Sequence, residues 1–167
     1  MEWSLSKLAI DGTLYVAALG VVIIGSLLYN NRLWIQDFPK EIQDLQPPLT
    51  PREKRDRVLM AGLLLVVMFG GLLLSNAALK AANGGALSFL SAYLNALALF
   101  NLFNLFDAVV IDWFMGVVVK APFMMLPGSE TRMHLYRDWN MHIANYLKGV
   151  IGGFVLCLPV ALVSLVV

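Results

Sequence analysis

The chain has 167 residues, of which 59% are hydrophobic and only 14% are charged. This composition, with a mean hydropathy of +0.75, lies far outside the range of soluble domains and indicates an integral membrane protein. The formal net charge is +1, from 12 basic and 11 acidic residues, so no charge excess points to nucleic acid as a partner. Because Cys157 is the only cysteine, an intrachain disulfide and a cysteine-based metal site are excluded.

Four apolar segments have about the roughly 20 helical residues that a hydrocarbon core of about 30 Å requires. They cover about residues 12–29, 57–79, 87–119 and 146–167. Because no period-2 alternation appears and unpaired backbone cannot lie in lipid, we expect helices rather than strands. The predicted fold is therefore all-α: a four-transmembrane-helix bundle in a single membrane domain, residues 1–167.

The first twelve residues, MEWSLSKLAIDG, lack the basic start and the small-residue cleavage site of a signal peptide. We therefore expect the first apolar segment to remain as a permanent anchor. The third segment has more residues than a bilayer requires, so we expect it to tilt, to project into the cytoplasm or to break near Gly116.

The basic residues predict the orientation of the helices. Ten of them lie in the two long loops or at the adjoining helix ends: Arg32, Lys40, Arg52, Lys54, Arg55, Arg57, Lys120, Arg132, Arg137 and Lys148. Only Lys7 and Lys80 lie on the opposite side. By the positive-inside rule, both long loops are cytoplasmic and both termini are on the non-cytoplasmic side.

Local signals predict short helices within the first loop. Thr50, Pro51 and Glu53 form a capping-box pattern, so the second helix should begin near Pro51. The stretch DFPKEIQDLQPP predicts one or two helical turns after Pro39. The apolar side chains of this loop are expected to face the membrane interface: Leu33, Trp34, Phe38, Ile42 and Leu45.

Small residues mark faces where helices approach closely. They are Gly20, Gly25, Gly62, Gly70, Gly71 and the pair Gly149-x-x-x-Gly153. Packing within the bundle is the simpler explanation, and a dimer contact is the alternative.

The stretch LFDAVVIDWF, residues 105–114, places two carboxylates in the third helix. At about 100° per residue, Asn101 and Asp112 point nearly the same way, while Asn104 lies about 60° and Asp107 about 120° round. Asp107 and Asp112 are then about 140° apart and are expected to face different partners. An ionised carboxylate at membrane depth is retained when it faces the bundle, a partner or water. Hydrogen-bonding glue between helices is one interpretation of these residues, and a functional site is the other.

The second loop supplies further polar groups. Turn and capping residues predict a helix from about residue 130 into the fourth segment, with His134, Asp138 and His142 on one stripe. Imidazole and carboxylate are ligands for zinc or iron, so this stripe and Asp107 or Asp112 form a candidate metal site. For His134 and Asp138 a solvated polar face is the favoured explanation. His142 lies where the chain re-enters the membrane, where it can pair with Asp107 or Asp112 for acid/base chemistry.

The stretches FDAVVIDW, LPGSE and YRDWNMHIANYLKG, within residues 101–153, resemble a family of small, uncharacterised bacterial membrane proteins. The resemblance implies a four-helix protein of the bacterial inner membrane and names no reaction. The residues that carry the family pattern are Asp107, Asp112, Trp113, Pro127, Gly128, Glu130, His142, Lys148 and Gly149. The pattern has no histidine at the position of His134.

The leading hypothesis is a cytoplasm-facing polar pocket that binds a ligand or a divalent metal and performs acid/base chemistry on a lipid-soluble substrate. The predicted catalytic residues are Asp107, Asp112 and His142, which are also the predicted metal ligands, with His134 and Asp138 as weaker ones. The predicted ligand-binding residues are Asn101, Asn104, Trp113 and Glu130.

Two further hypotheses remain open. The chain is a noncatalytic subunit or assembly partner of a larger membrane complex, or it is a small proton-coupled or ion transporter that works as a homo-oligomer. The lipid bilayer is a partner in every case. No phosphate-binding loop, nucleophile elbow or HExxH motif occurs in the sequence.

Overall fold

The computed structural model describes residues 5–166, which form helices and no strand. Four helical segments are long and apolar enough to cross a membrane. They are α1 (Leu5–Asn30), α3 (Pro51–Ala82), α4 (Phe89–Phe106) with its continuation η2 (Asp107–Val119), and α5 (Trp139–Val166). The predictions of an all-α fold with four membrane-spanning helices and of a multi-pass membrane protein are confirmed.

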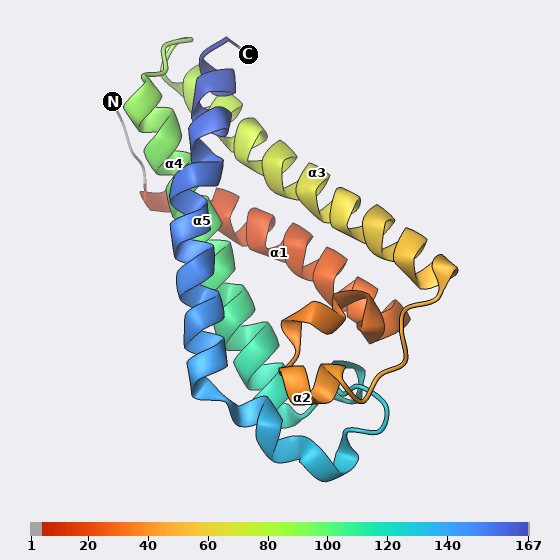
Figure 1. Cartoon of the computed structure of the whole chain (residues 1–167). Coiled ribbons are helices and arrows are strands. Elements are labelled where there is room, and N and C mark those ends of the chain that lie inside the picture. The colour runs from red at the N-terminus through yellow and green to blue at the C-terminus, as the bar shows by residue number, and fades with distance from the viewer. Residues whose placement is uncertain (1–4, 167) are drawn as a thin grey trace.

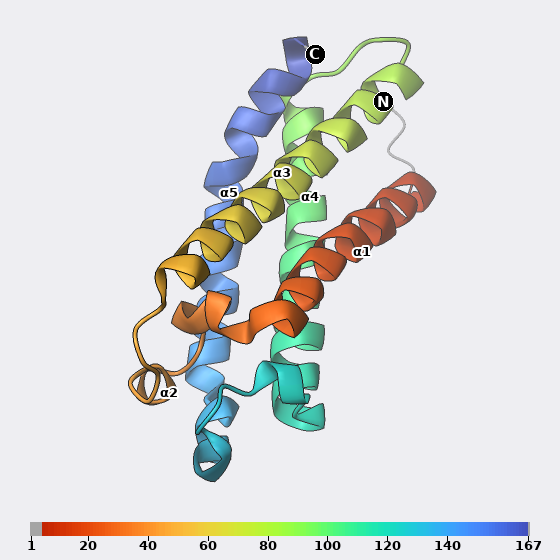
Figure 2. The same cartoon turned by 90° about the vertical axis from the view of Figure 1, so that its right-hand side faces the viewer.

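The helices pack as two pairs. α4 and α5 lie side by side along their length, and α1 and α3 cross them obliquely (Figures 1 and 2). The start of α1 and the end of α5 lie toward one end of the bundle, which we call the terminal end. The opposite end, the loop end, is closed by residues 31–50 and 120–138.

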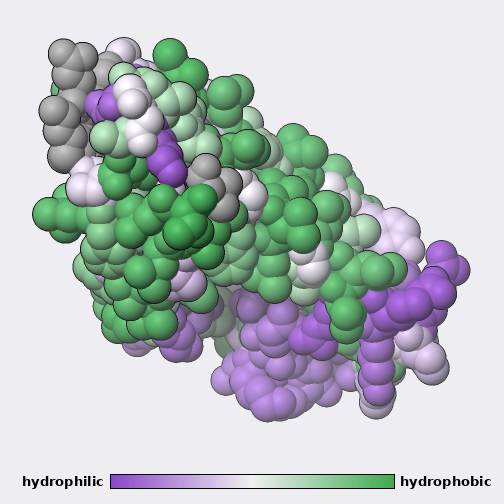
Figure 3. All heavy atoms as spheres, turned by 90° about the horizontal axis from the view of Figure 1, so that it is seen from above, coloured by the Kyte–Doolittle hydropathy of each residue, from purple (hydrophilic) through white to green (hydrophobic). Residues whose placement is uncertain are grey.

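One apolar core joins all four helices. Its fully buried members include Leu19 of α1, Leu72 of α3, Leu99 of α4 and Cys157 of α5. The outward faces are apolar as well, and Figure 3 shows hydrophobic residues over the helices and hydrophilic residues gathered to one side. A bundle that is apolar inside and outside fits a lipid environment, because lipid tails solvate the outer faces.

Glycines bring α4 close to its neighbours. A Cβ atom at Gly149 would lie 2.0 Å from Asn104 Oδ1, and one at Gly153 would lie 2.7 Å from Phe100, so both glycines of the Gly-x-x-x-Gly pair face α4. Gly20 and Gly71 also meet side chains of neighbouring helices, whereas Gly25, Gly62 and Gly70 face open space. The Gly149–Gly153 face is thus used for packing within the bundle, the simpler of the two explanations.

A buried polar network fastens the helices at the terminal end. This terminal cluster comprises Lys7, Asp11, Ser75, Asn76, Asn95 and Ser164. Ser75 donates to Asp11 at 2.5 Å, and Asn95 donates to Ser75 Oγ and to Asn76 Oδ1, each at 3.0 Å. Asn76 in turn donates to Ser164 Oγ at 2.9 Å and to a backbone carbonyl of α4 at 3.2 Å. Each of the four helices contributes to the network.

Local capping signals fix two helix starts. Thr50 and Glu53 form the predicted capping box, with Glu53 N–H donating to Thr50 Oγ1 at 3.2 Å and Thr50 N–H donating to Glu53 at 2.8 Å. α3 therefore begins at Pro51, as predicted. α5 begins at Trp139, before the apolar span predicted from about residue 146 but after residue 130, where the sequence predicts a helix that runs into this span. It begins there because the Asp138 carboxylate accepts hydrogen bonds from the N–H groups of Asn140 and Met141.

The first loop contains the predicted helical turn, α2 (Lys40–Gln43), after a 3₁₀ segment, η1 (Asn31–Asp37). The expectation that its apolar side chains face the membrane is wrong for Leu33, Phe38 and Ile42. Leu33 and Ile42 are fully buried, and Phe38 and Ile42 pack against residues of the second loop. The two loops therefore form a small core of their own beneath the bundle.

The third helix does not break at Gly116. Instead it changes its winding at Asp107, where η2 adopts π-helical hydrogen bonding that continues for 13 residues. The helix ends where Lys120 adopts a left-handed backbone conformation with φ of 54°. The helix thus keeps its length and changes which residues share a face.

Candidate functional site

A cavity of about 390 Å³ lies at the loop end of the bundle. Residues from all four long helices and from both loops line this loop-end cavity. Its polar lining residues are Asp37, Asp107, Asp112, His142, Asn145 and Lys148. The three predicted catalytic residues, Asp107, Asp112 and His142, therefore line one cavity.

The winding of η2 brings the two predicted carboxylates onto one face. In a π-helix each N–H bonds to the carbonyl five residues earlier, so residues five apart lie nearly above one another, as residues four apart do in an α-helix. Four residues of η2 line the cavity: Asp107, Ile111, Asp112 and Gly116. Their spacing of four or five residues fits a helix with more residues per turn than an α-helix. The expectation that Asp107 and Asp112 face different partners, which assumed α-helical geometry, is wrong.

Neither carboxylate of η2 has a hydrogen-bond or ion-pair partner among the described residues. Asp107 and Asp112 are half-buried, and within residues 5–166 neither accepts a hydrogen bond or forms an ion pair. A desolvated carboxylate without a partner is costly at membrane depth. The free energy of these two groups would fall if a ligand in the cavity supplied a positive charge or a hydrogen-bond donor.

His142 adds a ring nitrogen with free bonding capacity. Its Nε2 lies 2.9 Å from the backbone carbonyl oxygen of Tyr136, which can only accept, so Nε2 carries the hydrogen. In the neutral ring Nδ1 is then the acceptor, and it is buried with no hydrogen-bond partner among the described residues. This tautomer leaves one nitrogen able to take up a proton or to bind a polar group.

Asp37 is the third carboxylate of the cavity, and sequence reasoning missed it. It ends η1 in the first loop and is exposed to solvent at the cavity wall. A signal was available in the sequence, because Asp37 stands between Ile35 and the Phe38-Pro39 pair in a stretch expected at the membrane. Its position beside the third helix could not be read from that pattern.

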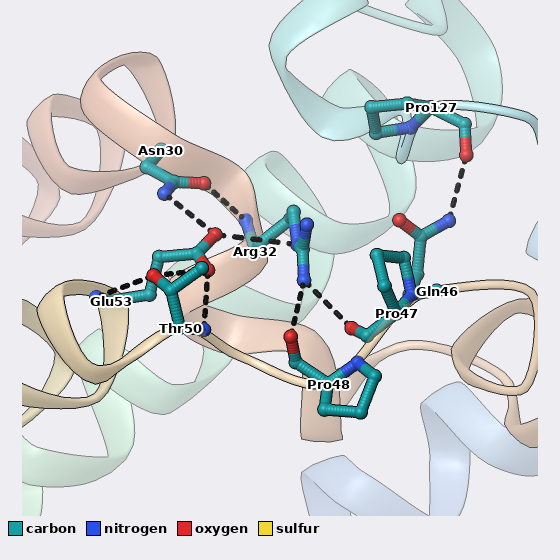
Figure 4. A network of polar contacts seen from close by, with 8 residues as sticks. All are labelled: Asn30, Arg32, Gln46, Pro47, Pro48, Thr50, Glu53 and Pro127. Carbon is teal, nitrogen blue, oxygen red and sulfur yellow. Dashed lines mark hydrogen bonds and ion pairs between the residues drawn. The ribbon is translucent and has the colours of Figure 1, made fainter.

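The first loop is held in place by a polar network that Figure 4 shows from close by. Arg32 pairs with Glu53 at 3.4 Å and donates to the Pro47 carbonyl at 2.7 Å. Gln46 donates to the Pro127 carbonyl at 2.7 Å and so joins the first loop to the second. These contacts fix η1, and with it Asp37, relative to α3 and the second loop.

The rest of the cavity wall is apolar and rich in aromatic rings. Trp34, Phe38, Phe103 and Tyr136 line the cavity together with aliphatic residues of α1 and α3, Ile23, Leu27 and Leu64. Trp34 is oriented by a hydrogen bond from its indole Nε1 to Ser26 Oγ at 2.8 Å. The cavity thus combines an apolar, aromatic wall with carboxylates, an imidazole and an ammonium group.

Three predicted ligand-binding residues do not line the cavity. Asn101 donates to the Leu97 carbonyl within its own helix at 2.9 Å, and Asn104 donates to the Tyr146 carbonyl of α5 at 3.1 Å. Glu130 is exposed and accepts a hydrogen bond from the N–H of Gly128 at 3.2 Å. Asn101 bonds within its own helix, Asn104 bonds to α5 and Glu130 bonds within a turn, so this geometry gives no support to a ligand-binding role for the three residues.

The predicted stripe of metal ligands is interrupted. η4 (Glu130–Arg137) is a 3₁₀ segment that ends at Asp138, which caps α5, so His134, Asp138 and His142 do not share one helix face. His134 and Asp138 are exposed. Within residues 5–166 no three His, Cys, Asp or Glu side chains are grouped to hold a metal ion. The metal prediction for Asp107, Asp112 and His142 therefore gains no support from the geometry.

Trp113 lies outside the loop-end cavity. It lines a second cavity of about 300 Å³ with residues that include Trp139 and Tyr146, and the rings of Trp113 and Trp139 have their centroids 5.8 Å apart. His142 lines this second cavity as well as the first. His142 is thus the residue that the two cavities share.

Comparison of the chain with protein-family models, with curated proteins and with solved structures found no match in any of the three. The resemblance of residues 101–153 to a family of small bacterial membrane proteins therefore stays a prediction. The loop-end cavity and its lining residues are the observations that bear on function.

Proposed function

We propose that this integral membrane protein binds a small lipid-soluble ligand in the loop-end cavity and transfers protons to or from it. The observation that carries the proposal is the meeting of Asp107 and Asp112 of η2 with His142 of α5 in one cavity with a largely apolar wall. A cavity of about 390 Å³ falls within the range of ligand pockets, which is roughly 300–1,000 Å³.

The positive-inside rule supports a cytoplasm-facing orientation of this cavity in a bacterial inner membrane. Ten basic residues lie in or beside the two loops that close the loop end. With that orientation the cavity takes up its ligand from the inner half of the bilayer, and Asp37 lies on the cytoplasmic side.

His142 is suited to the proton-transfer role. The carbonyl of Tyr136 holds Nε2–H, which leaves Nδ1 to accept a proton from the ligand. Asp107 or Asp112 is the complementary group, which stabilises the protonated imidazole or exchanges a proton with the ligand. The proposal needs no metal ion.

Native mass spectrometry of the protein released from lipid nanodiscs tests the proposal. We expect the wild type to retain a bound molecule of defined mass, and Asp107→Asn, Asp112→Asn and His142→Ala each to lose it. The matched control is Glu130→Gln, which removes a carboxylate that lies outside the cavity and should keep the molecule. If all three cavity variants retained the molecule and the cellular phenotype of the wild type, the proposal would be wrong.

The assembly-partner hypothesis needs a different surface from the one first expected. Gly149 and Gly153 face α4, so enlarging them disturbs the bundle itself and does not report on a partner. For the transporter hypothesis, a flux assay in proteoliposomes with wild type and Asp107→Asn remains the test.

A further inference from the structure

We infer that the ligand of the loop-end cavity is an amphiphile with an organic ammonium head group, which the three carboxylates and the aromatic wall recognise. The inference rests on the proposed function and names the class of ligand. It follows from three properties of the cavity: its charge, its aromatic lining and the placement of its apolar side chains.

The charged groups that line the cavity favour a cation. Asp37, Asp107 and Asp112 face His142 and Lys148, so carboxylates outnumber basic groups even when the imidazole is protonated. Lys148 is exposed and its Nζ lies 3.4 Å from Asn145 Oδ1, where it is solvated at the rim. Asp107 and Asp112 have no hydrogen bond or ion pair within residues 5–166, so a cation that enters meets two carboxyl groups with free hydrogen-bonding capacity.

The aromatic lining suits an ammonium group in particular. Trp34, Phe38, Phe103 and Tyr136 contribute rings to the same cavity. The negative face of an aromatic ring attracts cations, and cages of such rings recognise quaternary ammonium ligands. A small hydrated metal ion gains little from such a wall, because its stability depends on oxygen or nitrogen ligands.

The remaining lining residues favour a hydrocarbon chain on the ligand. Ile23 and Leu27 of α1 and Leu64 of α3 form an apolar part of the wall. Burying a chain there removes apolar surface from water, while the head group remains near the carboxylates. The cavity therefore fits a molecule with one charged end and one apolar end.

Binding of three amphiphiles with the same chain tests the inference: octyltrimethylammonium, octanoate and octanol. Each is added to the full-length protein in a maltoside detergent, and its dissociation constant is measured by calorimetric titration. We expect octyltrimethylammonium to bind at least about tenfold more tightly than octanoate or octanol, because the cation interacts with buried carboxylates. Asp107→Asn and Asp112→Asn should each weaken its binding about tenfold, whereas Glu130→Gln should leave it unchanged.

Asp37→Asn provides a variant outside the helix interior that should fold normally and weaken binding of the cation by a smaller factor. Monodisperse elution and an unchanged melting temperature without ligand confirm folding of each variant. If octanol or octanoate bound as tightly and depended on Asp107 and Asp112, the ammonium inference would fail and the proposed function would stand. If none of the three amphiphiles bound the wild type, the ammonium inference would fail. The proposed function would then be decided separately, by whether the cavity variants lose the bound molecule in native mass spectrometry.

Discussion

The terminal cluster and the loop-end cavity place polar groups at opposite ends of one bundle and differ in how those groups are satisfied. In the terminal cluster, Asn76 and Asn95 are almost fully buried and bonded to neighbouring helices. In the loop-end cavity, Asp107 and Asp112 border open volume and have no hydrogen bond or ion pair within residues 5–166. Satisfied polar groups in a close-packed site hold helices together, and unsatisfied ones around a cavity are available to a ligand.

Loss of the Asn76 amide should lower stability more than any other change considered below. Replacing it with Leu removes an amide that bonds to three groups, so Asn95, Ser164 and a carbonyl of α4 lose a partner. We expect the free energy of unfolding to fall by about 2–3 kcal/mol, measured by dodecyl sulfate titration from mixed micelles. The control is Asn101→Leu, because Asn101 donates only within its own helix and should cost less. Equal losses for the two variants would contradict the assignment of the terminal cluster to stability.

The second prediction concerns Gly149, which lies where α5 packs against α4. A Cβ atom there would lie 2.0 Å from Asn104 Oδ1, so Gly149→Ala should force the helices apart and lower the free energy of unfolding by about 1–3 kcal/mol. Gly152→Ala is the matched control, because no atom lies within 4 Å of its added Cβ. A Gly149→Ala protein as stable as Gly152→Ala would show that this contact is looser than described.

Arg32 stabilises the first loop at the loop end of the bundle. Arg32→Ala removes the pair with Glu53 and the hydrogen bond to Pro47, and we expect a loss of about 1 kcal/mol. Hydrogen exchange should rise in residues 31–50 and stay unchanged in the terminal cluster, because the network joins the loops to the end of α1 and the start of α3, at the loop end of the bundle. The control is Lys40→Ala, which breaks a surface pair with Asp44 and should change stability by less than about 0.5 kcal/mol. Uniform exchange across both ends in Arg32→Ala would contradict this division.

Asp107→Asn should have the smallest effect on stability. The carboxylate has no partner within residues 5–166 to lose, and the amide is less costly to bury, so the free energy of unfolding should stay within about 0.5 kcal/mol of the wild type or rise. The same titration measures it. A loss as large as that of Asn76→Leu would mean that Asp107 is structural glue, the interpretation that the cavity argues against.

The helices, the capping box and the membrane class could be predicted from the sequence because each depends on short stretches of chain. Thr50 and Glu53 lie three residues apart, and hydropathy alone identifies the four spans. Asp107, Asp112 and His142 could be selected from the sequence because charged groups at membrane depth are rare, and the structure places all three at one cavity. These choices needed no knowledge of how the helices pack.

What the sequence could not reveal depends on winding and on long-range contact. Asp107 and Asp112 share a face only because η2 is π-helical. No pattern of residues in the sequence predicts this π-helical segment. The contact of Asn104 with α5 could not be predicted, because hydropathy does not say which side of α4 meets α5. The stripe from His134 to His142 failed because Asp138, a good ligand by type, serves as a helix cap.

The most direct test measures stability and ligand retention in the same preparations of Asn76→Leu and Asp107→Asn. Unfolding titration and native mass spectrometry are run on each protein beside the wild type. We predict that Asn76→Leu loses stability and keeps the bound molecule in its folded fraction, and that Asp107→Asn keeps its stability and loses the molecule. An Asp107→Asn protein that unfolds as easily as Asn76→Leu while retaining the molecule would contradict the account.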